Sequence, residues 1–310
     1  MTMNQNRRKF LKVSSGALAL AALAPNGIAA EVAAQRKREF KKGFMMNSFP
    51  GSGKKMTWQE KFKLLKEAGF DGAEPPSHLD QKEILKARDA TGLAIASVVA
   101  SAYTRALSAA APSTRNQGAE GLKQALRDAK AYGASSVLCV AGHVDENVTY
   151  ADAWKRTREE ITKCLPLAEK LGVKIAVENV WNNFLLSPLE AARYVDEFKS
   201  PAVGWHFDVG NVISIGWPEQ WIRILGKRIQ KLHIKEFSRK KMNEEGLGKG
   251  FAVEYLEGDN DWPAVMKALD EVGYNGWCIV EPACGPCQEK FSPEEFVKNV
   301  SGQLDKILAS

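Results

Sequence analysis

The chain has 310 residues with a formal net charge of +6, and 45% of its residues are hydrophobic while 26% are charged. This composition excludes an intrinsically disordered protein, and five cysteines are too few for a disulfide-stapled scaffold. The positive charge lies at the front of the chain: residues 1–30 carry +4, residues 31–42 carry +3, and residues 43–310 carry −1. A nearly neutral body argues against nucleic acid as a partner.

The first thirty residues have the pattern of an export signal. Arg7 and Arg8 open a basic stretch that precedes the apolar run 13–24, and small residues follow this run. Such a pattern is typical of a cleaved signal peptide, and the run is too short for a stable membrane anchor. Consecutive arginines followed by Phe-Leu-Lys resemble the twin-arginine (Tat) signal of bacteria. We therefore expect export by the Tat machinery, cleavage near Ala29 or Ala30, and a periplasmic mature protein.

A basic linker is predicted at residues 31–42, and strand-length apolar runs then alternate with amphipathic helical patterns through residues 43–310. In chain order, strands are predicted at 43–47, 72–74, 94–100, 136–141, 174–178, 203–208, 231–235 and 277–281, and helices at 58–68, 81–91, 119–132, 151–171, 188–198, 262–272 and 293–308. Strands that alternate with helices pair in parallel. Eight such units predict a single-domain α/β protein, a (β/α)₈ TIM barrel. A doubly wound open sheet is disfavoured, because no Gly-x-Gly-x-x-Gly follows the first strand.

Four neighbouring strands of this predicted barrel end in, or contain near their ends, side chains that bind metals. The active site of a TIM barrel lies at the carboxyl ends of its strands, so these side chains are expected to meet. Three carboxylates and one imidazole form an oxygen-rich site that suits Mn²⁺, Mg²⁺, Co²⁺ or Zn²⁺ better than a thiolate site would. Taken singly, each residue has an ordinary explanation as a helix cap or a packed interior side chain. As a set they predict a metal site made by Glu178, Asp208, His233 and Glu281.

The segments around these residues resemble a known family. The motifs at 177–182, 207–211, 233–236 and 280–282, with those at 69–74 and 258–262, are similar to the sugar isomerase/epimerase family with a xylose-isomerase-like barrel. The resemblance covers essentially residues 43–310, and the relatives include ketose 3-epimerases and hydroxypyruvate isomerase. It is specific for the fold and the metal and much less so for the substrate.

The resemblance implies a metal-dependent sugar isomerase or epimerase with one divalent ion, for which Mn²⁺ is favoured. The four side chains named above would bind the ion, and Glu178 and Glu281 would also be the catalytic pair. An ion that holds a ketone oxygen and the neighbouring hydroxyl acidifies the C–H bond beside the carbonyl and stabilises the enediolate. One carboxylate would remove this proton and the other would return it from the opposite face. Export favours a free, non-phosphorylated sugar or keto-sugar as the substrate.

Six further residues are expected to contact the substrate. The family places an arginine where Arg239 stands, although a loop charge explains this residue equally well, and loop packing is an equal alternative for Trp181. The ketose 3-epimerases have a histidine where this chain has Asn211, and asparagine cannot shuttle protons near neutral pH. The expected substrate contacts are Arg239, Asn211, Glu74, His143, Trp181 and Lys235.

Two other functions stay open at this point. The first is a lyase that eliminates the aglycone from a keto-glycoside, which Asn211 and the expected export favour. The second is a sugar-binding protein without catalysis, against which the intact ligand set argues. The sequence leaves homo-oligomerisation open.

Two smaller features of the sequence remain ambiguous. His206 is either packed interior or a hydrogen-bond donor to the site. The Cys284-Gly285-Pro286-Cys287 motif follows a predicted barrel strand rather than opening a helix of a small redox fold, so thiol redox catalysis is disfavoured and a loop disulfide is left open.

Overall fold

The computed structural model describes residues 38–51, 56–100 and 104–310. The chain divides into two units, Met1–Arg38 and Glu39–Ser310, and the second holds all the elements described below. The predicted export signal and residues 31–37 of the predicted linker lie outside the described residues. Within the described ranges, no helix combines the length and the apolar character that a membrane crossing requires.

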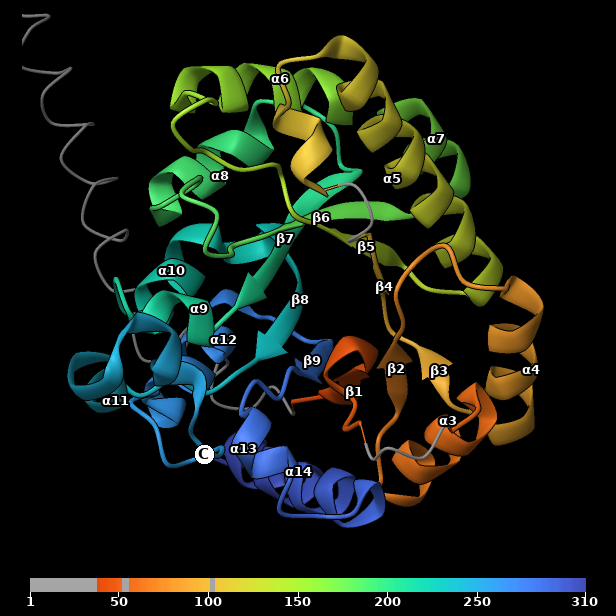
Figure 1. The fold of residues 1–310 in the computed structure, drawn as a ribbon, viewed down its shortest axis with the longest axis vertical. Coiled ribbons are helices and arrows are strands. Elements are labelled where there is room, and N and C mark those ends of the chain that lie inside the picture. The colour runs from red at the N-terminus through yellow and green to blue at the C-terminus, as the bar shows by residue number, and fades with distance from the viewer. Residues whose placement is uncertain (1–37, 52–55, 101–103) are drawn as a thin grey trace, which may run out of the picture. The chain divides into compact units, whose positions relative to one another are not determined.

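Nine parallel strands of the described chain form a nearly closed barrel, in the hydrogen-bonded order β3-β2-β1-β9-β8-β7-β6-β5-β4 (Figure 1). The predicted TIM barrel is thereby confirmed. The strands are β1 (Lys41–Met45), β2 (Gly72–Glu74), β3 (Ala94–Ile95), β4 (Val98–Val99), β5 (Ser136–Cys139), β6 (Lys174–Glu178), β7 (Val203–Asp208), β8 (Ile229–Ile234) and β9 (Trp277–Val280).

The nine strands correspond to the eight predicted ones, because the strand predicted at 94–100 is interrupted. Its first part, β3, pairs with β2, and its second part, β4, pairs with β5. Two backbone hydrogen bonds connect β4 to the residues that follow β2. The N–H of Ser77 donates to the carbonyl of Val99 at 2.9 Å, and the N–H of Val99 donates to the carbonyl of Pro75 at 2.9 Å. One interrupted strand therefore joins the two ends of the sheet.

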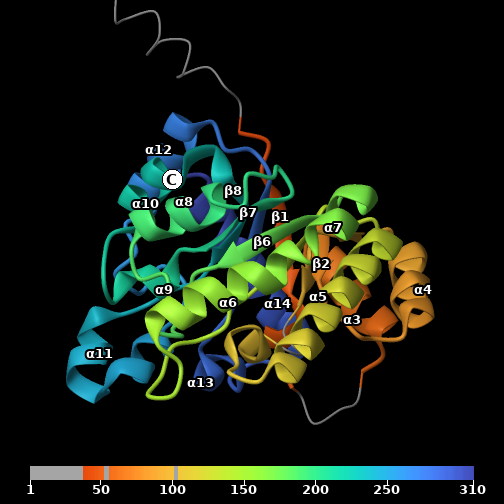
Figure 2. The ribbon, with the colours of Figure 1, turned by 90° about the horizontal axis from the view of Figure 1, so that it is seen from above.

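Helices surround the strands, as Figures 1 and 2 show from two directions. The predicted helix 151–171 is divided near Cys164, because Pro166 has no backbone N–H to continue the ladder and occupies the first turn of a new helix instead. The short helices after β7, β8 and β9 were not predicted. The α-helices are α3 (Trp58–Glu67), α4 (Gln81–Thr91), α5 (Pro112–Tyr132), α6 (Tyr150–Thr162), α7 (Leu165–Leu171), α8 (Pro188–Asp196), α9 (Gly210–Ile213), α10 (Pro218–Leu225), α11 (Arg239–Glu245), α12 (Trp262–Val272), α13 (Gly285–Gln288) and α14 (Pro293–Leu308).

The strands separate two hydrophobic clusters. Side chains of alternate strand residues point to opposite faces, so one set faces the helices and the other faces the barrel axis. The large cluster contains Phe44 and Val280, which pack with the helices, and the small one contains Met45, Leu138 and Ile279 from the other face of the strands. The polar strand residues discussed below occupy the same alternate positions as the small cluster, so their side chains point toward the barrel axis.

The barrel begins two residues before the predicted boundary at residue 43, because β1 includes Lys41 and Lys42. The Nζ of Lys42 donates to Ser301 Oγ at 2.6 Å and to Asp305 at 2.7 Å on the last helix, α14. Two residues of the predicted basic linker thus belong to the barrel, and one of them ties the first strand to the last helix.

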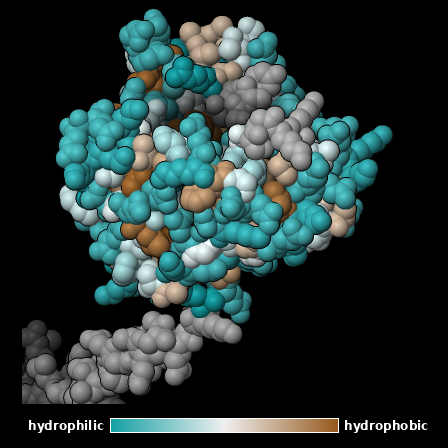
Figure 3. Space-filling model, turned by 60° about the horizontal axis from the view of Figure 1, so that its bottom comes forward, coloured by the Kyte–Doolittle hydropathy of each residue, from teal (hydrophilic) through white to brown (hydrophobic). Residues whose placement is uncertain are grey.

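The outer surface is mostly hydrophilic over the face drawn in Figure 3, with hydrophobic side chains scattered across it. The large exposed hydrophobic residues of the described chain include Leu186, Leu189, Ile215 and Trp217. Of these residues, Leu186 and Ile215 line one pocket together with Trp181 and Leu247.

Candidate metal centre

The four side chains predicted as metal ligands meet at the carboxyl ends of β6, β7, β8 and β9. One donor atom from each of Glu178, Asp208, His233 and Glu281 lies within 4.8 Å of the other three. The Nδ1 atom of His233 lies 2.8 Å from Glu178 Oε1 and 3.1 Å from Glu281 Oε2. Strands that are neighbours in the sheet therefore deliver three carboxylates and an imidazole to one place.

Two asparagines fix the backbone around Asp208. The Oδ1 of Asn179 accepts hydrogen bonds from Trp205 Nε1 at 3.1 Å and from the backbone N–H of Asp208 at 3.0 Å, while its Nδ2 donates to the Asp208 carbonyl at 2.7 Å. The backbone N–H of Asn211 donates to Asp208 Oδ1 at 2.8 Å, and its Nδ2 donates to the Asn179 carbonyl at 2.9 Å. The ends of β6 and β7 are thus joined, and the carboxylate of Asp208 has a defined orientation.

Lys235 places a positive charge against this cluster. Its Nζ lies 2.9 Å from Glu281 Oε1 and 3.4 Å from Asp208 Oδ2. Burial by itself would lower the pKa of Lys235, but the neighbouring carboxylates of Asp208 and Glu281 outweigh burial and leave the pKa raised. Lys235 is therefore charged, and the structure places this expected substrate contact in the centre itself.

The protonation of the cluster follows from crowding three carboxylates in a buried place. Burial raises the pKa of Asp208 to about 7, although Lys235 opposes the rise. The pKa of Glu281 is lowered despite burial, because Lys235 and His233 stabilise its charge. Burial alone would lower the pKa of His233, but Glu74 and Glu178 raise it well above its usual value. In the metal-free protein, bound protons and the ammonium group of Lys235 thus balance the negative charge of the carboxylates. A divalent cation could replace the protons, because oxygen-rich donor sets of this kind suit such ions.

The other expected substrate contacts lie in different surroundings. Glu74 has no exposed surface, and its Oε2 lies 2.7 Å from His233 Nε2, the ring nitrogen on the other side of the imidazole. The guanidinium of Arg239 donates to the carbonyls of Ile213 and Gly216, both at 3.0 Å, so it ties the loop after β7 to the start of α11. Both side chains thus have partners within the protein, and their contact with a substrate stays a prediction.

His143 lies in the connection that follows β5, and Trp181 lies in the connection that follows β6. The ring of His143 lies 3.1 Å from Ser108 Oγ and 2.9 Å from Asp145 Oδ2, so both of its nitrogens have protein partners. Trp181 is 40% exposed, and its indole N–H donates to the Asn211 carbonyl at 3.0 Å. Of these two side chains, Trp181 offers the larger open apolar surface.

An aromatic wall formed by Trp181, Phe237 and Phe251 was not predicted as a unit. The ring centroid of Trp181 lies 4.7 Å from that of Phe251 and 5.6 Å from that of Phe237. The Nζ of Lys235 lies 4.9 Å from the centre of the Phe251 ring, which connects the wall to the metal centre. Phe251 ends the 3₁₀ helix Leu247–Phe251 in a long irregular connection, and no periodic pattern in the sequence marks it.

The structure pairs Cys284 with Cys287 as a disulfide. The pair spans the short helix α13, where Cys284 Sγ also accepts the backbone N–H of Cys287. The disulfide closes one turn in the loop that follows Glu281, and it is the loop disulfide that the sequence left open.

The fold and the site together define a TIM barrel protein with a cluster of metal-ligand-type side chains at the carboxyl ends of its strands. The chain belongs to the xylose isomerase-like TIM barrel family, whose sequence profile matches residues 62–299.

Among curated proteins, an inosose dehydratase of Clostridium perfringens is 24% identical over 260 residues, which cover 77% of this chain and 87% of that protein. The match to the same enzyme of another strain is shorter, with 26% identity over 147 residues, and it spans about half (49%) of that relative's length.

Solved structures with the same fold include an Escherichia coli 3-keto-D-glucoside 4-epimerase, with a TM-score of 0.72 and 17% identity over 87% of this chain and 100% of that one. A D-psicose 3-epimerase aligns with a TM-score of 0.69 and 18% identity over 87% and 100% of the two chains. An IOLI protein with a bound zinc atom aligns with a TM-score of 0.71 and 17% identity over 87% and 98%.

Proposed function

We propose that the protein is a divalent-metal-dependent isomerase or epimerase that moves a proton beside the carbonyl of a free keto-sugar. The observation that carries this proposal is the convergence of Glu178 and Glu281, at 2.8 and 3.1 Å, on the Nδ1 of His233, with Asp208 in the same cluster. Structural neighbours that are named as keto-sugar epimerases support it.

The chemistry assigns separate tasks to the residues of the centre. A bound divalent ion supplies Lewis acidity that acidifies the C–H bond next to the carbonyl. One of Glu178 and Glu281 removes this proton, and the other delivers a proton to the opposite face, which inverts the carbon. Lys235 contributes a fixed positive charge beside Glu281 that stabilises negative charge on the enediolate oxygens. In the aromatic wall, Trp181 and Phe251 provide an apolar surface for the C–H face of a sugar ring, and the fully buried Phe237 supports them from behind.

The identity of the metal and the cellular compartment belong to the same proposal. Three carboxylates and one imidazole favour Mn²⁺, while a structural neighbour holds zinc. The basic and apolar pattern of residues 1–30 supports Tat export to the periplasm, where a non-phosphorylated substrate is expected.

Deuterium exchange tests the proposed proton transfer. Metal-loaded protein incubated in D₂O with a panel of keto-hexoses, keto-pentoses and 3-keto-glucosides is expected to replace the proton beside the carbonyl of at least one compound, which NMR detects. An epimeric or isomeric product accompanying the exchange supports the proposal. Absence of exchange with every member of the panel, in protein shown to hold its ion, counts against it.

A lyase is the second candidate, because the curated relatives that match are named inosose dehydratases and because the amide of Asn211 is bonded to Asn179. An asparagine held in this way transfers no proton at the place where the ketose 3-epimerases have a histidine. In the same NMR experiment, loss of water or of an aglycone from the substrate distinguishes elimination from epimerisation.

Metal affinity is expected to increase as the pH rises through about 7. In the metal-free protein burial raises the pKa of Asp208 to about 7, and the surrounding carboxylates keep His233 protonated. Both side chains must release their protons to bind a cation, so protons compete with the metal at low pH. Competition with a chelator should show an affinity gain of up to about tenfold per pH unit below pH 7 for each displaced proton. An affinity that stays constant from about pH 5.5 to 8 would contradict this protonation scheme.

A further inference from the structure

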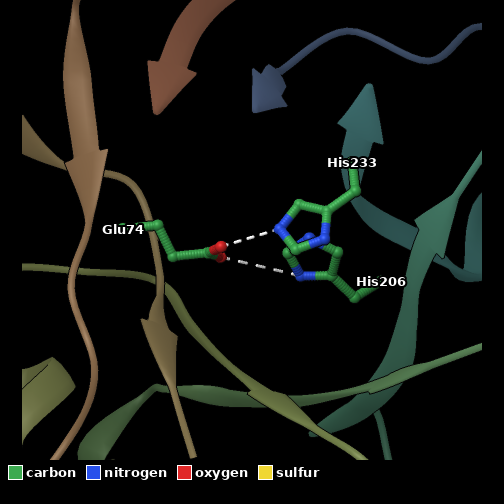
Figure 4. Close-up of side chains that lie close together, drawn as sticks. All are labelled: Glu74, His206 and His233. Atoms are coloured by element: carbon green, nitrogen blue, oxygen red, sulfur yellow. Dashed lines mark hydrogen bonds and ion pairs between the residues drawn. The ribbon is translucent and has the colours of Figure 1, made fainter. Parts of the chain in front are cut away.

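The barrel interior holds a second group of titratable side chains, which the proposed proton transfer does not use. Glu74, His206 and His233 are all fully buried, and they face one another across the barrel from β2, β7 and β8 (Figure 4). The Oε2 of Glu74 lies 2.7 Å from His233 Nε2, and its Oε1 lies 3.9 Å from His206 Nδ1. His233 therefore has carboxylates on both sides, with Glu74 at Nε2 and the proposed metal ligands at Nδ1.

We infer that Glu74 is a positioning residue, which holds the proton of His233 on Nε2 and so leaves Nδ1 free to bind the cation. A neutral imidazole carries one proton, and only the nitrogen without it can bind a metal. A buried carboxylate that accepts from Nε2 decides between the two tautomers and fixes the orientation of the ring. This inference rests on the proposed metal-dependent function. It adds that Glu74 orients His233, the one imidazole among the four proposed ligands.

His206 completes the arrangement by packing rather than by a short hydrogen bond. Its ring centroid lies 4.2 Å from that of His233, with an angle of 66° between the planes, so it restricts rotation of the His233 ring. Neither ring nitrogen of His206 has a hydrogen-bond partner among the described residues, and the same is true of Glu74 Oε1. Glu74 Oε1 lies 3.9 Å from His206, which is too far for a hydrogen bond, so the short hydrogen bond of this carboxylate is the one to His233.

A second cation among these three side chains is the competing explanation, because their donor atoms also lie within 4.8 Å of one another. The two sides of His233 differ in the ligands that they offer. Three carboxylates gather with His233 in the cluster at its Nδ1, whereas one carboxylate and one imidazole gather with it in the other cluster, so the richer ligand set places the cation at Nδ1. The 2.7 Å between Glu74 Oε2 and His233 Nε2 is the length of a hydrogen bond to a charged partner, so a proton on Nε2 accounts for this contact.

Two variants and one control test the inference through metal binding. Glu74→Leu removes the acceptor, and it is expected to weaken Zn²⁺ binding by about 10–100-fold in competition with a chelator. Glu74→Gln keeps an oxygen that can accept from Nε2 and should lose less affinity. Ser136→Ala is the control, because the buried hydroxyl of Ser136 in β5 has no hydrogen-bond partner among the described residues. It should bind Zn²⁺ like the wild type. Thermal unfolding of each metal-free variant verifies that the barrel is folded.

The wild-type protein provides a second readout that depends on no variant. With ¹⁵N-labelled histidine and Zn²⁺ bound, NMR should show His233 protonated at Nε2 and metal-bound at Nδ1, with one ion per chain. Two ions per chain with no proton on Nε2, or a folded Glu74→Leu protein that binds Zn²⁺ as tightly as the wild type, would overturn this inference alone. A wild-type protein that binds neither Zn²⁺ nor Mn²⁺ would refute the proposed function and this inference with it.

Discussion

Replacing Glu281 with glutamine is expected to slow proton exchange between keto-sugar and solvent by about 10³-fold, within the 10²–10⁴ range of general acid–base catalysis. The amide has the size of the carboxylate and keeps one oxygen toward the cluster, but it cannot accept a proton near neutral pH. Glu178→Gln should have an effect of the same order, because epimerisation requires one group on each face of the carbon. Initial rates of deuterium incorporation by NMR, at saturating metal and with the bound ion quantified, measure both losses.

A glutamate outside the centre provides the matched control for these substitutions. Glu271 pairs with Arg223 at 2.6 Å on the surface, so Glu271→Gln makes the same chemical change without touching the cluster and should leave the rate unaltered. A metal-loaded Glu281→Gln protein with the full exchange rate would refute the assigned pair. If only one of the two substitutions in the centre stops exchange, a single base suffices, which is the pattern expected of elimination rather than of epimerisation.

The location of the candidate metal centre could be predicted from the sequence, because the geometry of a TIM barrel brings the carboxyl ends of its strands together. Strands predicted at 174–178 and 203–208 have the same bounds in the structure, and Glu178 and Asp208 are the last residues of these strands. Parallel strands in a closed sheet bring their carboxyl ends to one rim, so the convergence of the donors needs no knowledge of the loops.

The partners of Glu74 could not be predicted in the same way. Strand alternation tells which side chains face the barrel axis, but it does not tell which of them meet across it, because this depends on the tilt and stagger of the strands. Glu74 was expected to contact the substrate because it is the last residue of a predicted strand. The structure shows its carboxylate at the Nε2 of His233, on a strand of only three residues, and its contact with a substrate stays a prediction.

Side chains in the connections between strands were the least predictable part of the site. Arg239 has the spacing from His233 that the resemblance implies for a substrate contact, yet the path of the loop after β7 puts two carbonyl groups against its guanidinium. Phe251 forms part of the aromatic wall from a connection without periodic pattern. Sequence spacing along a loop does not determine its course in space, whereas spacing along a strand does.

Removal of the metal is expected to abolish activity while the barrel stays folded. Lewis-acid stabilisation is worth several kcal/mol, which corresponds to a loss of at least about 10³-fold in rate at about 1.4 kcal/mol per tenfold. Dialysis against a chelator should therefore reduce exchange to background, and Mn²⁺ should restore it best among the divalent ions tested. The protein remains folded because His233 and Lys235 compensate the carboxylates when the ion is absent. Circular dichroism of the chelated protein checks this point.

Binding of the ion should also raise thermal stability, by about 2.7 kcal/mol at a free metal concentration one hundred times the dissociation constant. Asp208→Asn separates this effect from unspecific metal binding. The amide keeps the shape and an acceptor for the N–H of Asn211 but withdraws one negative charge from the centre, so both the stabilisation and the recovery of activity should largely disappear. Full activity in protein from which the ion has verifiably been removed, or equal stabilisation of Asp208→Asn and wild type by Mn²⁺, would contradict a metal centre at these strand ends.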